Sequence, residues 1–381
     1  MRVVIDALSV IASEVGGGET YIAGLVDHLG KVDPRHQYTV LTTRLGRHSF
    51  STTAENVHFK IMSLDNRSRF RRVVYEQTRL PDEIRQCGGA DVVHFPGNMV
   101  SGKVAARFPT VVTIHDVSPN FYLRSFPAHT SRLRAFVLLR FLDYAARRST
   151  VVVTDSQFSR REICEYSGIA ETRVHVIPLG LAPMVAVEND TISVLRRYGI
   201  APPYVLSIGT TNKHKNLDAL VRAFANARRS SGFRHHLVIG GREGSGHTDL
   251  QHAVSTTQAS EFVHLIGYVD SAHLPTLYQA ADAFAMPSLY EGFGFPALEA
   301  MHLGVPVILS VGTSLTEVGG DACVYVNPRS EQSITEALVK ILTDSALREQ
   351  LSERGKKQAG RFSWKQTAQE MVRVYELAAS T

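Results

Sequence analysis

The sequence predicts an α/β protein with two domains, each built around a parallel β-sheet, and three observations support this. The chain has 381 residues, which is too long for one compact core. Short β-branched runs alternate with segments of helical periodicity along the chain, as they do in doubly wound folds. The order of strand, polar or glycine-containing loop, and helix opens the chain and starts again at Tyr204; this order begins a Rossmann-type unit.

Composition places the chain among ordinary globular proteins. Hydrophobic residues make up 44% and charged residues 20%, and the net charge of +5 is compatible with an anionic substrate, an acidic membrane surface or neither. Cys87, Cys164 and Cys323 are odd in number and far apart, so we expect a reducing compartment and no metal cluster. The chain opens directly on a strand and has no run of about 18 apolar residues, so the expected location is cytoplasmic.

The first half supplies a complete set of alternating elements. Strands are expected at Arg2–Ala7, Tyr38–Thr42, Val57–Ile61, Asp91–Phe95, Thr110–His115, Thr150–Ser156 and Val174–Pro178. Helices are expected at Tyr21–Leu29, Asn66–Leu80, Ser131–Arg148 and Ser159–Ser167. Gly16–Thr20 is expected to be a loop, and its three contiguous glycines do not match the G-x-G-x-x-G dinucleotide spacing. His115 and Asp116 follow a strand, at the sheet edge where open α/β sheets bind ligands.

The second half repeats the alternation after a break at Pro178–Pro183. Strands are expected at Tyr204–Gly209, His236–Gly240, Phe262–Gly267, Ala283–Met286 and Pro306–Ser310. Helices are expected at Leu217–Ala227, Leu274–Ala281, Ser330–Leu342 and Ser345–Gly360, with a final helix from Phe362. We therefore expect a first domain over 1–180, a hinge over 181–200, a second domain over 201–360 and a terminal helix over 361–381. Lys215 lies in the polar loop at 210–216, where an ammonium could offset the charge of a diphosphate.

The stretch Pro287–Met301 is the most informative part of the sequence. Gly292 and Gly294 let the backbone adopt positive φ and approach a ligand, and Pro296 suits the first helical position. The amides ahead of that helix then form an anion site. Glu291 and Glu299 flank it, and both carboxylates can accept hydrogen bonds from hydroxyl groups. A diphosphate beside two such carboxylates describes a nucleotide-sugar site.

These sequence motifs resemble those of a known family. Glu291 and Glu299 match the Glu-x7-Glu motif of retaining glycosyltransferases with the GT-B fold. Ser-Leu-Tyr-Glu-Gly-Phe-Gly, Leu-Glu-Ala-Met and Gly-Val-Pro-Val are similar to glycosyltransferase family 4, mannosyltransferase-B-like branch, from Met1 to about Trp364. The resemblance implies two facing Rossmann-like domains, an acceptor-binding one first and a nucleotide-sugar-binding one second, with the last helix crossing back to the first.

The same resemblance implies a retaining hexosyltransferase without a cofactor. No Asp-x-Asp metal motif is evident in the sequence, so we expect the reaction to be metal-independent. The favoured donor is GDP-mannose, with dTDP-rhamnose, UDP-hexose or GDP-fucose open. The acceptor is expected to be a polysaccharide, a lipid-linked saccharide or another glycoconjugate or small molecule. Residues expected to be catalytic are His115, Glu291 and Lys215. Residues expected to bind the donor are Gly17, Gly209, Thr210, Lys215, Arg242, Glu291, Gly292, Phe293, Gly294, Phe295 and Glu299. His94 and Asp116 are expected on the acceptor side. Thr210 stands where the family often has arginine.

Two further questions stay open in the sequence. Arg67, Arg69, Arg71 and Arg72 form either a solvated helix face or a patch that meets anionic lipid or a lipid-linked acceptor; nucleic acid is not expected, because no aromatic residues are interleaved with them. The alternative functions are another GT-B enzyme, such as a sugar-nucleotide epimerase, and a catalytically silent nucleotide-sugar-binding subunit. An NAD-dependent oxidoreductase is disfavoured by the missing fingerprint.

Overall fold

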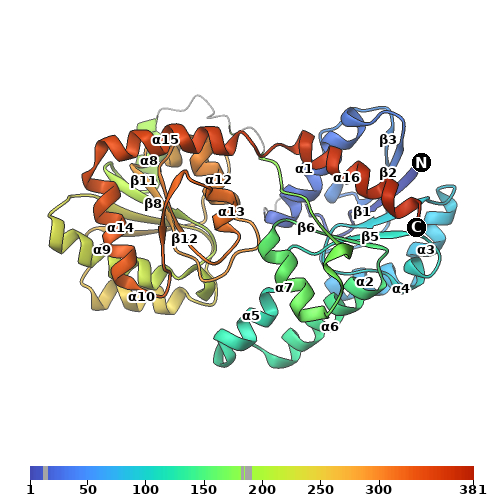
Figure 1. Cartoon of the computed structure of the whole chain (residues 1–381), viewed down its shortest axis with the longest axis horizontal. Helices are drawn as coiled ribbons and strands as arrows, with labels where there is room; N and C mark the ends of the chain where they lie inside the picture. The colour runs from blue at the N-terminus through green and yellow to red at the C-terminus, as the bar shows by residue number, and fades with distance from the viewer. Residues whose placement is uncertain (12–15, 182–183, 185–190) are drawn as a thin grey trace. The chain divides into compact units, whose positions relative to one another are not determined.

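The structure is a computed structural model that describes residues 1–11, 16–181, 184 and 191–381. The chain forms two compact units (Figure 1). Unit 1 comprises Met1–Ala182 together with Phe362–Thr381, and unit 2 comprises Pro183–Arg361. Within the predicted hinge over 181–200, residues 182, 183 and 185–190 lie outside the described residues, and a short helix begins at Thr191.

Unit 1 contains a fully parallel sheet in the order β3-β2-β1-β4-β5-β6-β7. Its strands are β1 (Arg2–Asp6), β2 (Gln37–Thr43), β3 (Val57–Met62), β4 (Val92–Phe95), β5 (Thr110–Thr113), β6 (Val151–Thr154) and β7 (Val174–Val176). Its helices are α1 (Gly17–Val32), α2 (Arg69–Thr78), α3 (Leu80–Gln86), α4 (Gly102–Ala105), α5 (Ser118–Ser125), α6 (Arg132–Arg148), α7 (Gln157–Ser167) and α16 (Trp364–Ala379). The 3₁₀ turns are η1 (Gly46–Ser49), η2 (Pro127–His129) and η3 (Glu171–Arg173).

Unit 2 contains a second parallel sheet in the order β10-β9-β8-β11-β12-β13. Its strands are β8 (Tyr204–Ile208), β9 (His236–Gly240), β10 (Val263–Gly267), β11 (Ala283–Met286), β12 (Val307–Ser310) and β13 (Cys323–Val326). Its helices are α8 (Thr191–Arg197), α9 (Leu217–Ser231), α10 (His247–Thr256), α11 (Leu274–Gln279), α12 (Phe295–His302), α13 (Leu315–Gly319), α14 (Glu331–Thr343) and α15 (Ser345–Ala359), with the turn η4 (Lys213–Lys215).

The central strands explain why the sequence adopts this architecture. Every residue of β4, β5, β6, β11 and β12 is buried, so both faces of each sheet are covered. Strands covered on both faces read as continuous apolar runs rather than as an alternation, and the Val-rich run Val151–Val153 is one of them. Two parallel-sheet Rossmann-like units confirm the predicted fold class.

The final helix belongs to unit 1. Helix α16 contacts α1, β4 and β5, and Trp364 at its start is 3% exposed. The Trp364 ring lies 6.4 Å from the Tyr21 ring, and it covers Gly24 so closely that a Cβ there would lie 2.2 Å from the indole. The lone tryptophan therefore anchors α16 on α1, and the return of the last helix to the first unit agrees with the fold class.

Several local predictions need correction. Gly16–Thr20 is not wholly a loop, because α1 begins at Gly17 after the N-cap Gly16. The helix expected over Asn66–Leu80 is split into α2 and α3, and Ser68 caps α2 by accepting from the Arg71 amide. Arg72 does not join the predicted basic face: its side chain turns inward and pairs with Glu76 at 3.2 Å.

The structure also bears on membrane spanning. Of the helices within the described residues, none is both long and apolar enough to cross a bilayer.

A double-mutant cycle tests the anchoring of α16. Trp364→Ala should lower the free energy of unfolding by about 3–5 kcal/mol, because it leaves a cavity against Gly24 and Tyr21. Gly24→Ala should destabilise the native protein through its clash with the indole, but in the Trp364→Ala background it should stabilise by up to about 1 kcal/mol, since alanine is the better helix former. Urea denaturation followed by circular dichroism measures all four proteins, and an unchanged sign for Gly24→Ala would contradict the packing described.

Candidate active site

Each sheet has a pocket at the point where its strand order reverses. In unit 1, β1 lies between β2 and β4, and a pocket of about 230 Å³ is bordered by the segments that follow β1, β4 and β5. In unit 2, β8 lies between β9 and β11, and a smaller pocket is bordered by the segments that follow β8 and β11. Open α/β sheets bind ligands at the carboxyl ends of strands beside such a reversal, so both pockets are candidate ligand sites.

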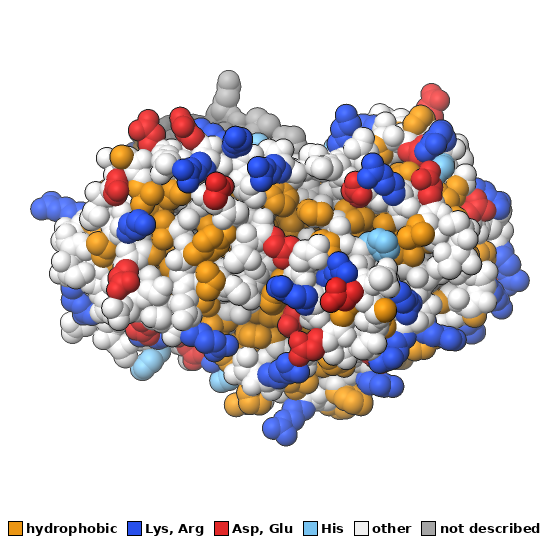
Figure 2. Space-filling view, viewed as in Figure 1, with side chains coloured by type: hydrophobic (Ala, Val, Ile, Leu, Met, Phe, Trp, Pro, Cys, Tyr) orange, Lys and Arg blue, Asp and Glu red, His pale blue; other side chains and the backbone are white. Residues whose placement is uncertain are grey.

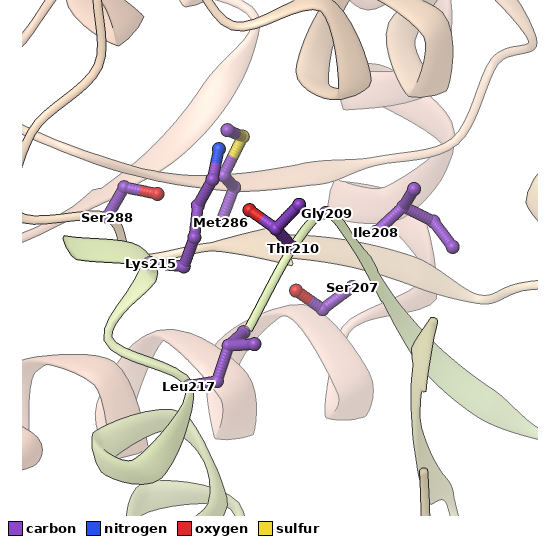
Figure 3. Close-up of a pocket in the computed structure, with 8 residues that line it drawn as sticks. All are labelled: Ser207, Ile208, Gly209, Thr210, Lys215, Leu217, Met286 and Ser288. Atoms are coloured by element: carbon purple, nitrogen blue, oxygen red, sulfur yellow. The ribbon is translucent and has the colours of Figure 1, made fainter. Parts of the chain in front are cut away.

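The unit 2 pocket gathers residues from two adjacent loops (Figure 3). Lys215 extends from the β8–α9 loop alongside Met286, and Thr210 and Ser288 present hydroxyl groups to the same space. Gly209 lies beside the Lys215 side chain, and its φ of 151° is a backbone conformation that favours glycine. The Ser288 hydroxyl is buried without a hydrogen-bond partner among the described residues, so it is available to a polar ligand.

Lys215 is held in place by a carboxylate from a distant loop. Its ammonium donates to Glu291 Oε1 at 2.7 Å, and both side chains are largely buried. The neighbouring Asn216 adopts φ 59° and donates to the carbonyls of Pro287 and Pro328, which fixes the loop behind Lys215. The two predicted catalytic residues of unit 2 are thus in direct contact.

A second lysine of this loop is already engaged. Lys213 forms an ion pair with Asp249, so its charge is balanced within the protein. Arg242, expected at the donor, lies with its guanidinium carbon 4.8 Å from the centre of the Tyr268 ring. It is exposed and stands beyond the residues that line the pocket with Lys215. Lys215 is therefore the cation that lines this pocket within the described chain.

The glycine-rich turn before α12 has the predicted form with one correction. Helix α12 begins at Phe295, so Pro296 occupies its second position rather than its first. The N-cap Gly294 has φ 116°, and a Cβ there would lie 2.4 Å from the Leu315 side chain. Glycine is required on both counts.

Ser314 holds the same turn in place. Its hydroxyl lies within hydrogen-bonding distance of the carbonyls of Glu291, at 2.8 Å, and Phe293, at 2.9 Å. The serine clamps the segment from Glu291 through Gly292 to Phe293, so that the amides that follow keep their direction. Sequence reasoning missed this residue, because a serine more than 20 positions downstream carries no local pattern that links it to the turn.

Glu299 is fixed by an unpredicted partner. Tyr278, on α11, donates its hydroxyl to Glu299 Oε2 at 2.8 Å. Burial raises the pKa of Glu299, and the hydrogen bond from Tyr278 opposes that rise. The second carboxylate of the motif therefore has a set orientation before any ligand binds.

His115 has a buried carboxylate behind it in unit 1. Its Nδ1 lies 2.7 Å from Asp155 Oδ2, and the Tyr21 ring meets it edge-on at 5.0 Å. Burial works to lower the pKa of His115, but the charge and hydrogen bond of Asp155 outweigh it and hold that pKa above its ordinary value. With Nδ1 given to Asp155, the free position is Nε2, which is buried without a hydrogen-bond partner among the described residues.

Glu19 is the second unsatisfied group at this pocket. It lines the pocket together with His115; its Oε1 accepts from Ser49 at 2.6 Å, while Oε2 is buried without a partner in the described chain. An imidazole nitrogen and a carboxylate oxygen that both lack partners suit a hydroxylated ligand. Gly17 is the glycine of this segment that was predicted to bind the donor. In the structure Gly17 is exposed at the start of α1, and its neighbour Gly18 lines the pocket.

The acceptor-side role expected for His94 needs correction. His94 is fully buried within β4, with Nε2 at 2.8 Å from the Thr113 hydroxyl and Nδ1 at 2.8 Å from the Tyr375 hydroxyl. Burial, followed by the nearby charge of His115, lowers its pKa to about 3. Both ring nitrogens are used inside the core, so His94 connects α16 to the sheet. Asp116, the other acceptor-side candidate, accepts from the Ser118 amide at 2.8 Å.

One group of side chains in the described residues has the spacing of metal ligands. Asp33, His36 and Glu376 offer ligand atoms within 4.8 Å of one another, but Arg35 pairs with both carboxylates, at 2.9 and 3.2 Å. None of the predicted site residues belongs to this group.

Comparisons with known proteins agree on one family. The model for "Glycosyltransferase Family 4" matches residues 15–183, and the model for "Glycosyl transferases group 1" matches residues 197–358. O-antigen chain mannosyltransferase B from Escherichia coli is 32% identical over 270 residues, which is 70% of this chain and 70% of that protein.

Solved structures match over the whole chain at lower identity. Sucrose-phosphate synthase from Thermosynechococcus elongatus has a TM-score of 0.78 at 19% identity, covering 100% of both chains. Anabaena HepE in complex with UDP and glucose has a TM-score of 0.72 at 18% identity, covering 99% of both chains. At these identities the structures establish the fold.

The pairing of His115 with Asp155 generates a test by titration. Asp155→Asn removes the carboxylate that raises the pKa of His115, while the imidazole stays buried. The pKa of His115 should therefore fall below its ordinary value of about 6.5. In the native protein the pair stabilises most below about pH 6.5 and above the pKa of Asp155, which burial raises. This stabilisation should fade as pH rises through the raised pKa of His115. NMR titration of the imidazole and urea unfolding across pH measure both. Asp143→Asn, which removes the partner of Arg147, is the control and should leave both curves unchanged; an unaltered His115 titration in Asp155→Asn would refute the assignment.

Proposed function

Since the chain belongs to glycosyltransferase family 4, in its mannosyltransferase-B-like branch, we propose that it transfers mannose from GDP-mannose to a saccharide hydroxyl with retention at the anomeric carbon. The acceptor class is a polysaccharide, a lipid-linked saccharide or another glycoconjugate. We choose mannose as the donor sugar because the relative described above is a mannosyltransferase. The competing donors in the test are UDP-hexose, dTDP-rhamnose and GDP-fucose.

The contact between Lys215 and Glu291 carries the proposal. An ammonium has three donors, and Glu291 takes one of them at 2.7 Å, which leaves two for diphosphate oxygens. The turn held by Ser314 opens α12 nearby in sequence, and its amides and helix terminus add positive potential. Lys215, the α12 amides and the hydroxyl groups of Thr210 and Ser288 together suit a nucleoside diphosphate, and Glu299 suits its ribose hydroxyls.

The proposed reaction stabilises the leaving group rather than forming a covalent sugar–enzyme bond. The bond between the anomeric carbon and the diphosphate oxygen loosens first, and Lys215 with the α12 amides offsets the charge that develops on that oxygen. The acceptor oxygen then bonds to the anomeric carbon on the same face, and its proton passes to the departing diphosphate. Retention follows because departure and attack use one face of the sugar.

The state of the two glutamates supports this route over a double displacement. A carboxylate nucleophile must be free to attack the anomeric carbon, with its acid partner about 5 Å away. Glu291 is instead ion-paired with Lys215, and Glu299 accepts from Tyr278. Neither carboxylate is therefore free to act as a nucleophile, whereas both can still accept hydrogen bonds from hydroxyl groups of a ligand. His115, oriented by Asp155, is the proposed partner of the transferred sugar through Nε2, and Glu19 and Asp116 are proposed on the acceptor side.

Substitution of Lys215 tests the proposed role together with the donor. The purified protein should transfer or hydrolyse GDP-mannose in preference to UDP-glucose, dTDP-rhamnose and GDP-fucose, with product stereochemistry read by NMR. Lys215→Ala should lower kcat by about 10²–10³ through loss of leaving-group stabilisation. Arg242→Ala is the matched control in the same unit and should cost far less. Turnover without acceptor to an isomerised nucleotide sugar would favour the epimerase alternative, and donor binding without turnover would favour the silent subunit.

Metal independence is tested separately. We expect kcat to be unchanged by excess EDTA and by added Mg²⁺ or Mn²⁺, since Lys215 and the α12 amides are proposed to balance the diphosphate charge themselves. The assay compares initial rates with and without chelator after dialysis. A loss of activity in EDTA that Mn²⁺ restores would overturn this part of the proposal.

A further inference from the structure

Helix α6 has apolar residues on two opposite faces. Ala135, Leu139, Leu142, Ala145 and Ala146 are buried against unit 1. The other side faces solvent and would normally carry polar side chains, but here it carries large apolar ones. These are Leu133, Phe136, Val137, Phe141 and Tyr144, all exposed. Leu133 and Phe136 are 74% and 60% exposed, so neither packs on the rest of the chain.

Helix α2 presents the same combination. Phe70 is 79% exposed and Val74 43%, and the spacing of 70 to 74 places them on one face of the helix. Arg71, next to Phe70 in the helix, and Arg67, just before the N-cap Ser68, are both exposed. Helix α4 links the two helices: it contacts α2, and its first residue, Gly102, lies against the Tyr144 hydroxyl group on α6.

The charges around these apolar side chains are predominantly positive. Arg67, Arg71, Arg132 and Arg134 are exposed, and no ion pair joins any of them to a carboxylate in the described part of the chain. Asp143 is the acidic residue of α6, and it is already shared by Arg140 and Arg147. Figure 2 shows hydrophobic and basic side chains mixed at the lower edge, where Figure 1 labels α5 and α6.

We propose that the outward faces of α2 and α6 form a membrane-docking surface that inserts Phe70, Leu133 and Phe136 among anionic phospholipids. Amphipathic helices that lie in a bilayer interface combine large apolar side chains with an arginine- or lysine-rich border, and anionic headgroups attract such a border. A protein partner is the competing occupant, because arginine and aromatic side chains are also enriched in protein interfaces, and the vesicle test below separates the two.

Vesicle binding tests the surface directly. The full-length protein should co-sediment with vesicles of phosphatidylglycerol and phosphatidylcholine but not with phosphatidylcholine alone, and its binding should weaken as salt rises. Leu133→Ser/Phe136→Ser should lower the partition coefficient at least about tenfold, and Arg67→Gln/Arg71→Gln about thirtyfold. Activity on a water-soluble acceptor should be unchanged, since none of these residues lines either pocket.

Matched controls come from unit 2. Ile192→Ser removes a side chain that is 63% exposed, and Arg354→Gln/Lys357→Gln removes two exposed charges from α15; both should bind vesicles like the native protein. The reporter Phe136→Trp should show a blue shift with anionic vesicles, above the constant signal of buried Trp364, and Ile192→Trp should not.

Three results would overturn the inference. The first is equal binding to neutral and anionic vesicles, and the second is unaltered vesicle binding by the α2 and α6 variants. The third is a native dimer in light scattering that Leu133→Ser/Phe136→Ser converts to a monomer, because the surface would then be an interface between two copies of the chain. Vesicle binding needs neither donor nor acceptor, so failure here leaves the proposed transfer reaction intact, and failure to find a donor leaves vesicle binding intact.

Discussion

The parallel pairing of strands is the constraint on which the rest of the structure depends. Parallel neighbours end at the same edge of a sheet, and where the order reverses the loops on either side diverge and leave a hollow. Both sheets reverse once, at β1 between β2 and β4 and at β8 between β9 and β11. His115 and Lys215 both line the hollows that result. The order in which the strands pair therefore determines where the proposed site lies, whichever side chains line it.

A second regularity is that reactive groups are oriented by residues remote in sequence. Asp155 holds His115 from the end of the neighbouring strand, Tyr278 holds Glu299, and Ser314 holds the turn that contains Glu291. Each of these partners is itself buried or partly buried, so the orienting contacts are shielded from water and remain strong. A site arranged in this way loses little entropy when a ligand binds.

Local patterns in the sequence were sufficient for the fold and for several residues of the proposed site. Apolar β-branched runs located most strands, and the glycine turn with its two glutamates located the proposed anion site. The missed features depend on tertiary contacts. No sequence pattern near Asp155 or Ser314 indicates their bonds to His115 and Glu291. Strand β13 is a short apolar run at the edge of its sheet, and its pairing with β12 was not predicted. His94 was misjudged for the same reason: a histidine at a strand end looks exposed until Tyr375, 281 residues away, is seen to bond to it.

The division of unit 1 between the two ends of the chain has a consequence for synthesis. Its core is closed by α16, through Trp364 against Gly24 and Tyr375 against His94, whereas unit 2 is one continuous segment. On the ribosome, the segment encoded second can therefore finish folding first. The amino-terminal segment, although it emerges earlier, must wait with an open hydrophobic side until the last twenty or so residues arrive, which makes that interval the one in which chaperone protection matters most.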